Sequence, residues 1–215
     1  MKLFDSTIAS EVAAKLLEIQ AIRLQPEKPF TWASGWKSPI YCDNRLSLSF
    51  PDVRNFIKDN LAKAIRLHFP EVEAIAGVAT AGIPQGALLA DVLDIPFIYV
   101  RSKAKGHGME NMIEGKVTPG QKVVVVEDLI STGGSSLKAV ADLKAAGFEV
   151  LGMVAIFTYG FELAEKNFEE AGVSLVCLSD YAAMLPQAVA DGYIDNGTLT
   201  SLEKWRQNPS IWKQD

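Results

Sequence analysis

The chain has 215 residues, of which 48% are hydrophobic, and this is enough for one domain with a substantial core. Its formal net charge of −5 argues against a general role in binding nucleic acid. The two cysteines, Cys42 and Cys177, and the two histidines, His68 and His107, are too far apart to predict a disulfide framework or a metal site.

The hydropathy of the chain argues against membrane insertion, and its N-terminal segment argues against export. No apolar stretch reaches the length needed to span a bilayer. Asp5 and Glu11 lie within an amphipathic pattern, which is not typical of a signal peptide. We therefore expect a cytoplasmic protein whose partners include neither a membrane nor nucleic acid.

Segments with helical spacing alternate with short apolar runs along the chain. The first predicted helix, residues 6–22, has one apolar face and can be capped by Ser6 or Thr7. Further helices are predicted over residues 51–69, from the turn at 77–84 to about 93, and over 137–146, 161–171, 181–191 and 199–205. Strands are predicted at 72–78, 95–100, 123–126, 149–157 and 173–178. This alternation predicts an α/β fold with a doubly wound, mainly parallel sheet of about five strands.

Residues 29–50 differ from the rest, because aromatic residues, turn residues and charges are mixed there around Gly35. The pattern predicts a small antiparallel hairpin with a polar edge. An ordinary surface hairpin and a functional one fit this pattern equally well.

Residues 123–136 carry the clearest chemical signal in the chain. Four valines predict a strand buried on both faces, and Glu127 and Asp128 follow it directly. The next turn combines hydroxyl side chains with Gly133 and Gly134, and its amides at a helix start favour a phosphate. The acids would repel that phosphate, so we expect them to accept hydrogen bonds from sugar hydroxyls or to lie near a divalent cation. A capped helix after a buried strand is the simpler interpretation, but it leaves the two acids unexplained.

Two common phosphate-binding motifs are excluded by the same residues. The turn lacks the lysine of a G-x-x-x-x-G-K-[ST] loop, which argues against triphosphate hydrolysis. It also lacks G-x-G-x-x-G, and its acids precede its glycines, which argues against dinucleotide binding.

Two other loops follow predicted strands, at residues 79–83 and 101–115. The second is long for an α/β connection, carries three cations and a histidine, and is typical of a lid over a polyphosphate. Both loops also allow plainer interpretations, as a packing turn and a solvated turn. Ligands bind at the carboxyl ends of parallel strands, so one ligand that contacts all three loops would carry a phosphate, a ribose and a pyrophosphate.

Residues 123–136 resemble the phosphoribosyl pyrophosphate (PRPP) signature of the type I phosphoribosyltransferases. Residues 30–45 resemble the N-terminal orotate-site segment of the orotate phosphoribosyltransferases, and residues 101–108 resemble their catalytic loop, with its Lys-x-His-Gly ending. The three segments occur in family order, and the length matches the shorter bacterial form. The resemblance implies the type I phosphoribosyltransferase fold as a single domain over residues 1–215. Its core would span about 51–178, and a small hood would be built from about 1–50 plus 179–215.

The resemblance also implies a reaction, a cofactor and partners. PRPP and orotate would give orotidine 5′-monophosphate and pyrophosphate in pyrimidine synthesis, with Mg²⁺ held mainly through PRPP and Asp128 as a candidate ligand. The chain would act as a homodimer, with the basic loop reaching the partner's site. The implied catalytic residues are Arg101, Lys105, His107 and Asp128. The implied PRPP-binding residues are Thr80, Ala81, Gly82, Arg101, Lys105, His107, Glu127, Asp128, Leu129, Ile130, Ser131, Thr132, Gly133, Gly134 and Ser135. The implied orotate-binding residues are Lys37, Tyr41, Arg45 and Ser131.

The chain departs from the family pattern at three positions. Some members have a lysine where Ala33 and Ala81 stand, and an arginine where this chain has Thr158 and Tyr159. Lys37 and Arg45 are candidates to replace these contacts. A purine phosphoribosyltransferase and a PRPP-sensing regulator on the same fold are the alternative hypotheses, since a fold alone does not separate them.

Overall fold

A computed structural model describes residues 1–32, 35–102 and 112–213. Within them the central sheet has seven strands, in the order β1-β11-β10-β9-β6-β7-β8. Neighbouring strands run parallel except for the pair at the β8 edge. The strands are β1 (Lys2–Leu3), β6 (Ala74–Val78), β7 (Phe97–Val100), β8 (Ile113–Glu114), β9 (Lys122–Ile130), β10 (Glu149–Thr158) and β11 (Leu175–Asp180).

The doubly wound, mainly parallel sheet is confirmed, but the prediction of five strands is wrong. The two additional strands, β1 and β8, lie at the two edges and have two residues each. A pair of residues is too short to show an alternating pattern, so such strands are visible only through their partners.

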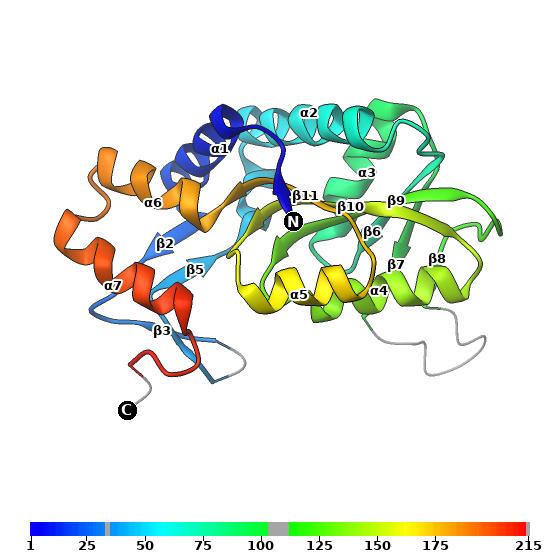
Figure 1. Ribbon diagram of the computed structural model, residues 1–215. Coiled ribbons are helices and arrows are strands. Elements are labelled where there is room, and N and C mark those ends of the chain that lie inside the picture. Colours follow the sequence, from blue (N-terminus) through cyan, green and yellow to red (C-terminus); the bar gives the residue numbers. More distant parts are fainter. Residues whose placement is uncertain (33–34, 103–111, 214–215) are drawn as a thin grey trace.

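Helices cover both faces of the sheet (Figure 1). One face carries α1 (Ser6–Glu18), α2 (Pro51–His68) and α3 (Gly82–Leu93), and the other carries α4 (Gly134–Ala145) and α5 (Glu162–Glu170). The four central valines are fully buried and alternate between the two layers. Val124 and Val126 pack with the first helix layer, while Val123 and Val125 pack with the second. This alternation explains why β9 reads as a continuous apolar run.

The segments predicted to form a hood, residues 1–50 and 179–215, hold several smaller elements, although β1 and α1 of the first segment join the central sheet and its helix layer. The antiparallel pair of β3 with β4 confirms the predicted hairpin around Gly35, and a second antiparallel pair, β2 with β5, was not predicted. A 3₁₀ helix, η1, then leads into α2, and two helices close the chain. Figure 1 shows these strands together with α6 and α7 at one end of the molecule (left in the view). The bounds are β2 (Ile22–Leu24), β3 (Phe30–Thr31), β4 (Lys37–Ser38), β5 (Ile40–Cys42), η1 (Asn44–Ser49), α6 (Tyr181–Ala190) and α7 (Asn196–Gln207).

The first helix differs from its prediction at both ends. Asp5, rather than Ser6 or Thr7, is its N-cap, and the Asp5 carboxylate accepts hydrogen bonds from two backbone N–H groups of the first turn. The helix ends at Glu18 because residues 22–24 pair with β5, a contact that local sequence does not reveal. Among the described residues, every helix is too short or too polar to cross a bilayer.

Candidate active site

The acid pair lies within the last four residues of β9, not after the strand as the sequence predicts. Pairing of β9 with β6 ends at Val126, whereas pairing with β10 continues to Ile130. The strand therefore extends past its β6 neighbour, and the segment that carries both acids borders the site at the carboxyl end of β6.

Glu127 is buried, and its side chain links β9 to α4 through hydrogen bonds. Its Oε1 accepts a hydrogen bond from the Asp128 N–H, and its Oε2 accepts one from the Ser136 hydroxyl, both at 3.0 Å. Burial raises the pKa of Glu127 well above its ordinary value, and the neighbouring Asp128 charge adds to this increase. A carboxylate offers about four acceptor positions, so these two contacts leave capacity for a ligand.

Asp128 is more exposed than Glu127 and is held by the hood. Asn44 donates from Nδ2 to the Asp128 carbonyl at 2.7 Å. Burial raises the pKa of Asp128, while the nearby Arg45 guanidinium acts in the opposite direction. Of the two acids, Asp128 is thus the one better placed to meet a ligand. Asn44 is a site residue that we did not predict, because its contact spans 84 positions and leaves no local signal.

The turn after β9 is anchored by its carbonyls. The Ile130 carbonyl accepts hydrogen bonds from the Tyr159 N–H and the Thr158 hydroxyl, and the Thr132 carbonyl accepts one from the Asn167 amide. Gly133 then adopts φ +80° as the N-cap of α4, and no side chain caps the helix. The backbone N–H groups at the start of α4, beside exposed Gly134 and Ser135, therefore have no side-chain cap, an arrangement that favours an anion.

The turn after β6 lies beside the acid pair and contains a cis peptide bond between Ala79 and Thr80. It leads directly into α3 at Gly82, where a Cβ atom would lie 2.3 Å from the Val126 carbonyl oxygen. Only glycine allows this approach, which brings residues 80–82 against the β9 backbone. The predicted pyrophosphate loop and the predicted ribose acids are therefore neighbours in space.

The third predicted loop is described only in part. Arg101 pairs with Glu114 across the β7–β8 edge, with 3.2 Å between Nη1 and Oε1. Both side chains keep more than a quarter of their surface exposed, so the guanidinium has further donors to offer. Lys105 and His107 lie outside the described residues, and their roles stay predictions.

Each of the three predicted orotate contacts in residues 30–45 has a partner within the first 50 residues. Lys37 donates to the Thr31 hydroxyl at 3.1 Å. Tyr41 lies beneath the Arg23 guanidinium at 5.0 Å from the ring centre. Arg45 is largely exposed and forms a two-pronged ion pair with Asp43, at 2.6 and 2.9 Å.

An aromatic stack lies directly after β10, at the position where the pattern that the sequence resembles has an arginine. Tyr159 is buried, and its ring lies 5.2 Å from Trp32 and 5.5 Å from Phe161. Trp205 of α7 packs edge-on against it at 5.7 Å. Burial raises the pKa of Tyr159 well above its ordinary value, and the proximity of Cys42 and Asp128 acts in the same direction. The stack joins the hairpin to α7 and places a phenol close to the acid pair.

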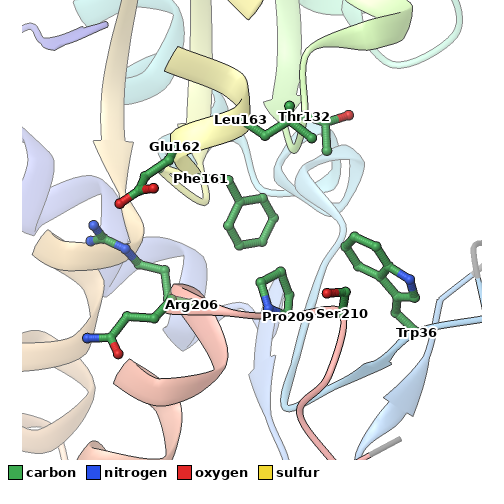
Figure 2. A pocket seen from close by; sticks show the side chains of 10 residues that line it. Trp36, Thr132, Phe161, Glu162, Leu163, Arg206, Pro209 and Ser210 are labelled. Atoms are coloured by element: carbon green, nitrogen blue, oxygen red, sulfur yellow. The ribbon is translucent and has the colours of Figure 1, made fainter. Parts of the chain in front are cut away.

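A cavity of about 260 Å³ lies next to this stack and to the turn after β9. Figure 2 shows the Phe161 ring between Trp36 of the hairpin on one side and Arg206 of α7 on the other. The cavity is lined by Trp36, Thr132, Gly160, Phe161, Glu162, Leu163, Arg206, Gln207, Pro209 and Ser210. Among the described lining residues, Thr132 is the one that we predicted for the site, as a PRPP contact. None of the four predicted orotate contacts, all of which the structure describes, lines the cavity.

The matching family model and the most similar curated relatives agree with each other. The family model for the phosphoribosyl transferase domain matches residues 51–178. Orotate phosphoribosyltransferase from Cytophaga hutchinsonii is 62% identical over 95% of this chain and 98% of its own length. The enzyme of the same name from Porphyromonas gingivalis is 56% identical over 96% of this chain and 98% of its own length.

A solved structure agrees with these sequence matches. The crystal structure of orotate phosphoribosyltransferase from Aeropyrum pernix superposes with a TM-score of 0.74 at 31% identity. The match covers 82% of this chain and 97% of that one.

Proposed function

The chain belongs to the orotate phosphoribosyltransferase family, and from this premise we infer what each part of its site does. It transfers the phosphoribosyl group of PRPP to orotate, giving orotidine 5′-monophosphate and pyrophosphate in pyrimidine biosynthesis. The juxtaposition of the turn at 79–82, the acids of β9 and the turn at 131–136 is the observation that supports these assignments.

PRPP, the phosphoribosyl donor, is held by residues of β9 and of the turn that follows it. The 5-phosphate binds at the start of α4, where N–H groups and hydroxyls converge on an anion. Asp128 accepts hydrogen bonds from the ribose hydroxyls, and Glu127, already committed to Ser136 and the backbone, fixes the direction of that strand segment. This division explains why one acid is buried and its neighbour is not.

The pyrophosphate leaves toward the turn at 79–82 and toward Arg101 of the partner subunit, at the start of its basic loop. Cleavage of the bond between C1 and pyrophosphate leaves a cation-like sugar and a highly charged leaving group, so cations must gather there and water must be kept out. The partner's Arg101 supplies one cation, and the predicted contributions of the partner's Lys105 and the partner's His107 supply others. Mg²⁺ bound through the pyrophosphate would neutralise further charge, and the half-buried Asp128 carboxylate is an oxygen ligand of the kind that Mg²⁺ accepts.

The acceptor binds between the hairpin and the phosphate turn. Ser131 donates to orotate from the core side, while Lys37 and Tyr41 contact it from the hood. The Arg45 guanidinium is already neutralised in part by Asp43, so we assign it to the electrostatic environment of Asp128 and orotate together. The enzyme acts as a cytoplasmic homodimer in which the basic loop serves the partner's site.

The decisive experiment mixes purified protein, PRPP and Mg²⁺ with orotate, adenine, guanine or hypoxanthine in separate reactions. Loss of orotate absorbance is expected, with no product from the purines. The matched control is the Asp128→Ala variant, which should bind and convert far less PRPP with any base. Turnover of a purine without turnover of orotate would reject orotate as the acceptor and favour the purine alternative. Binding of PRPP without turnover of any base would favour the regulatory alternative.

A further inference from the structure

A series of buried polar side chains connects the hood to the part of the site that is proposed to bind PRPP. Asn44, the first residue of η1, is 1% exposed. Its Nδ2 donates to the Asp128 carbonyl at 2.7 Å, and its Oδ1 accepts from the Cys42 thiol at 3.3 Å. The thiol contact fixes which end of the amide faces β9, so the donor end points at the strand.

The same series of hydrogen bonds continues to α3, the helix that follows the turn at 79–82. Ser47, which is fully buried, donates to the Asn44 carbonyl at 2.6 Å. Gln85 of α3, which is 2% exposed, donates to the Ser47 hydroxyl at 3.4 Å. Three parts of the site are thereby linked through η1: the start of α3, the hairpin exit and the acid pair. Buried polar groups with partners on three elements specify one arrangement of those elements, because any shift leaves a donor or an acceptor unsatisfied.

We propose that Asn44 is a positioning residue for Asp128. It holds the β9 backbone at the point from which the Asp128 carboxylate projects, and so keeps that carboxylate directed at the ribose of PRPP. Asn44 lies between Tyr41 and Arg45 in the chain, so the segment that meets the acceptor is tied directly to the residue that meets the donor. This inference rests on the proposed role of Asp128.

The physical reason is that the Asp128 carboxylate lies only a few bonds from the backbone that Asn44 holds. A carboxylate one bond beyond Cβ follows any rotation of its own peptide unit, and the Asn44 contact is made to that unit. Hydrogen bonds to the sugar depend steeply on distance and angle. A small rotation at residue 128 would therefore weaken PRPP binding while the fold stays intact.

The test measures the dissociation constant of PRPP with Mg²⁺ by calorimetry for wild type, Asn44→Ala, Asp128→Ala and the double variant. Loss of one well-placed hydrogen bond predicts about tenfold weaker binding for Asn44→Ala. If Asn44 acts through the carboxylate, the same substitution should cost less than about threefold when Asp128 is already alanine, since sites that share a function are not additive. An equal loss in both backgrounds would overturn the proposal, as would unchanged binding by Asn44→Ala.

Asn60 of α2 provides a matched control. It is also a buried asparagine that donates from Nδ2 to a backbone carbonyl, that of Phe56 at 2.9 Å, and accepts at Oδ1, from Lys63 at 3.4 Å. Asn60→Ala should lower the melting temperature about as much as Asn44→Ala and leave PRPP affinity unchanged. Comparable losses of affinity in both variants would mean that Asn44 acts only through stability.

A second variant covers the case in which Asn44→Ala does not fold. Ser47→Ala keeps the Asn44 amide but removes the hydroxyl that anchors its backbone, so PRPP binding should weaken by about threefold. Binding equal to wild type would overturn the proposal. Failure of the wild-type chain to bind PRPP at all would instead reject the function on which the inference rests.

Discussion

A substitution at Gly82 tests how closely the turn at 79–82 must approach β9. A Cβ atom at this position would lie 2.3 Å from the Val126 carbonyl oxygen, whereas ordinary contact begins near 3.4 Å. Val126 belongs to the central strand of the sheet and is held on both sides, so the oxygen cannot retreat. In Gly82→Ala the turn at 79–82 must therefore move away from β9 by about 1 Å.

A displacement of that size predicts two separate losses. Misplacement of reacting groups by about 1 Å can reduce turnover by about 100-fold, and we expect this reduction in kcat/KM for PRPP. The forced contact should also lower the free energy of unfolding by about 1–3 kcal/mol, a decrease in melting temperature of about 2–12 °C for a chain of this size.

Steady-state kinetics and thermal unfolding measure the two losses independently. Gly197→Ala in the first turn of α7 is the control, because its new Cβ would meet only the Asp195 side chain at ordinary distances. That variant should retain full activity and gain a little stability from helix propensity. If Gly82→Ala keeps kcat/KM within about threefold of wild type, close approach of the turn to β9 is not needed for catalysis and our assignment of residues 80–82 fails.

Three further predictions address the acid pair, the metal and the basic loop. The raised pKa of Glu127 means that the folded state holds a proton more tightly than the unfolded state, so stability falls as pH rises above the ordinary glutamate value. Glu127→Gln should therefore show a smaller decrease in melting temperature between about pH 5 and about pH 8 than wild type, and identical pH profiles would count against this. Chelation of Mg²⁺ should abolish turnover, and added Mg²⁺ should restore it; full activity with chelator present would remove the metal from the reaction. Mixing inactive Lys105→Ala and Asp128→Ala chains should recover about a quarter of wild-type activity if the loop acts across a dimer, whereas no recovery would place the loop in its own site.

Local pattern was sufficient to predict the strand, turn and helix around β9. The buried valine run, the acids after it and the glycine turn are consecutive in the chain, and the predicted strand, turn and helix are all present. The edge strands β1 and β8 were missed because two residues carry no periodicity. The acids were placed after the strand because charge usually ends a buried run, yet pairing with β10 carries β9 past them.

The parts of the site that depend on distant contacts could not be predicted from the sequence. Asn44 lies inside a segment that we singled out, but its role depends on a carbonyl 84 residues away. The packing of Tyr159 depends on Trp32 and Trp205, which come from opposite ends of the chain. Arg45 was assigned to orotate as a cation, whereas its ion pair with Asp43 becomes visible only in three dimensions.

The aromatic stack at Tyr159 also determines what can be seen by spectroscopy. All four tryptophans lie in the hood, at positions 32, 36, 205 and 212, and the core from 51 to 178 contains none. Trp205 is fully buried, and Trp32 contacts it with 5.6 Å between ring centres. Tryptophan emission therefore reports the hood and its contacts with Tyr159 and Phe161, while far-ultraviolet circular dichroism reports the helices and strands of the whole chain. A shift in emission at constant ellipticity would reveal movement of the hood over an intact sheet, and no attached dye is needed to observe it.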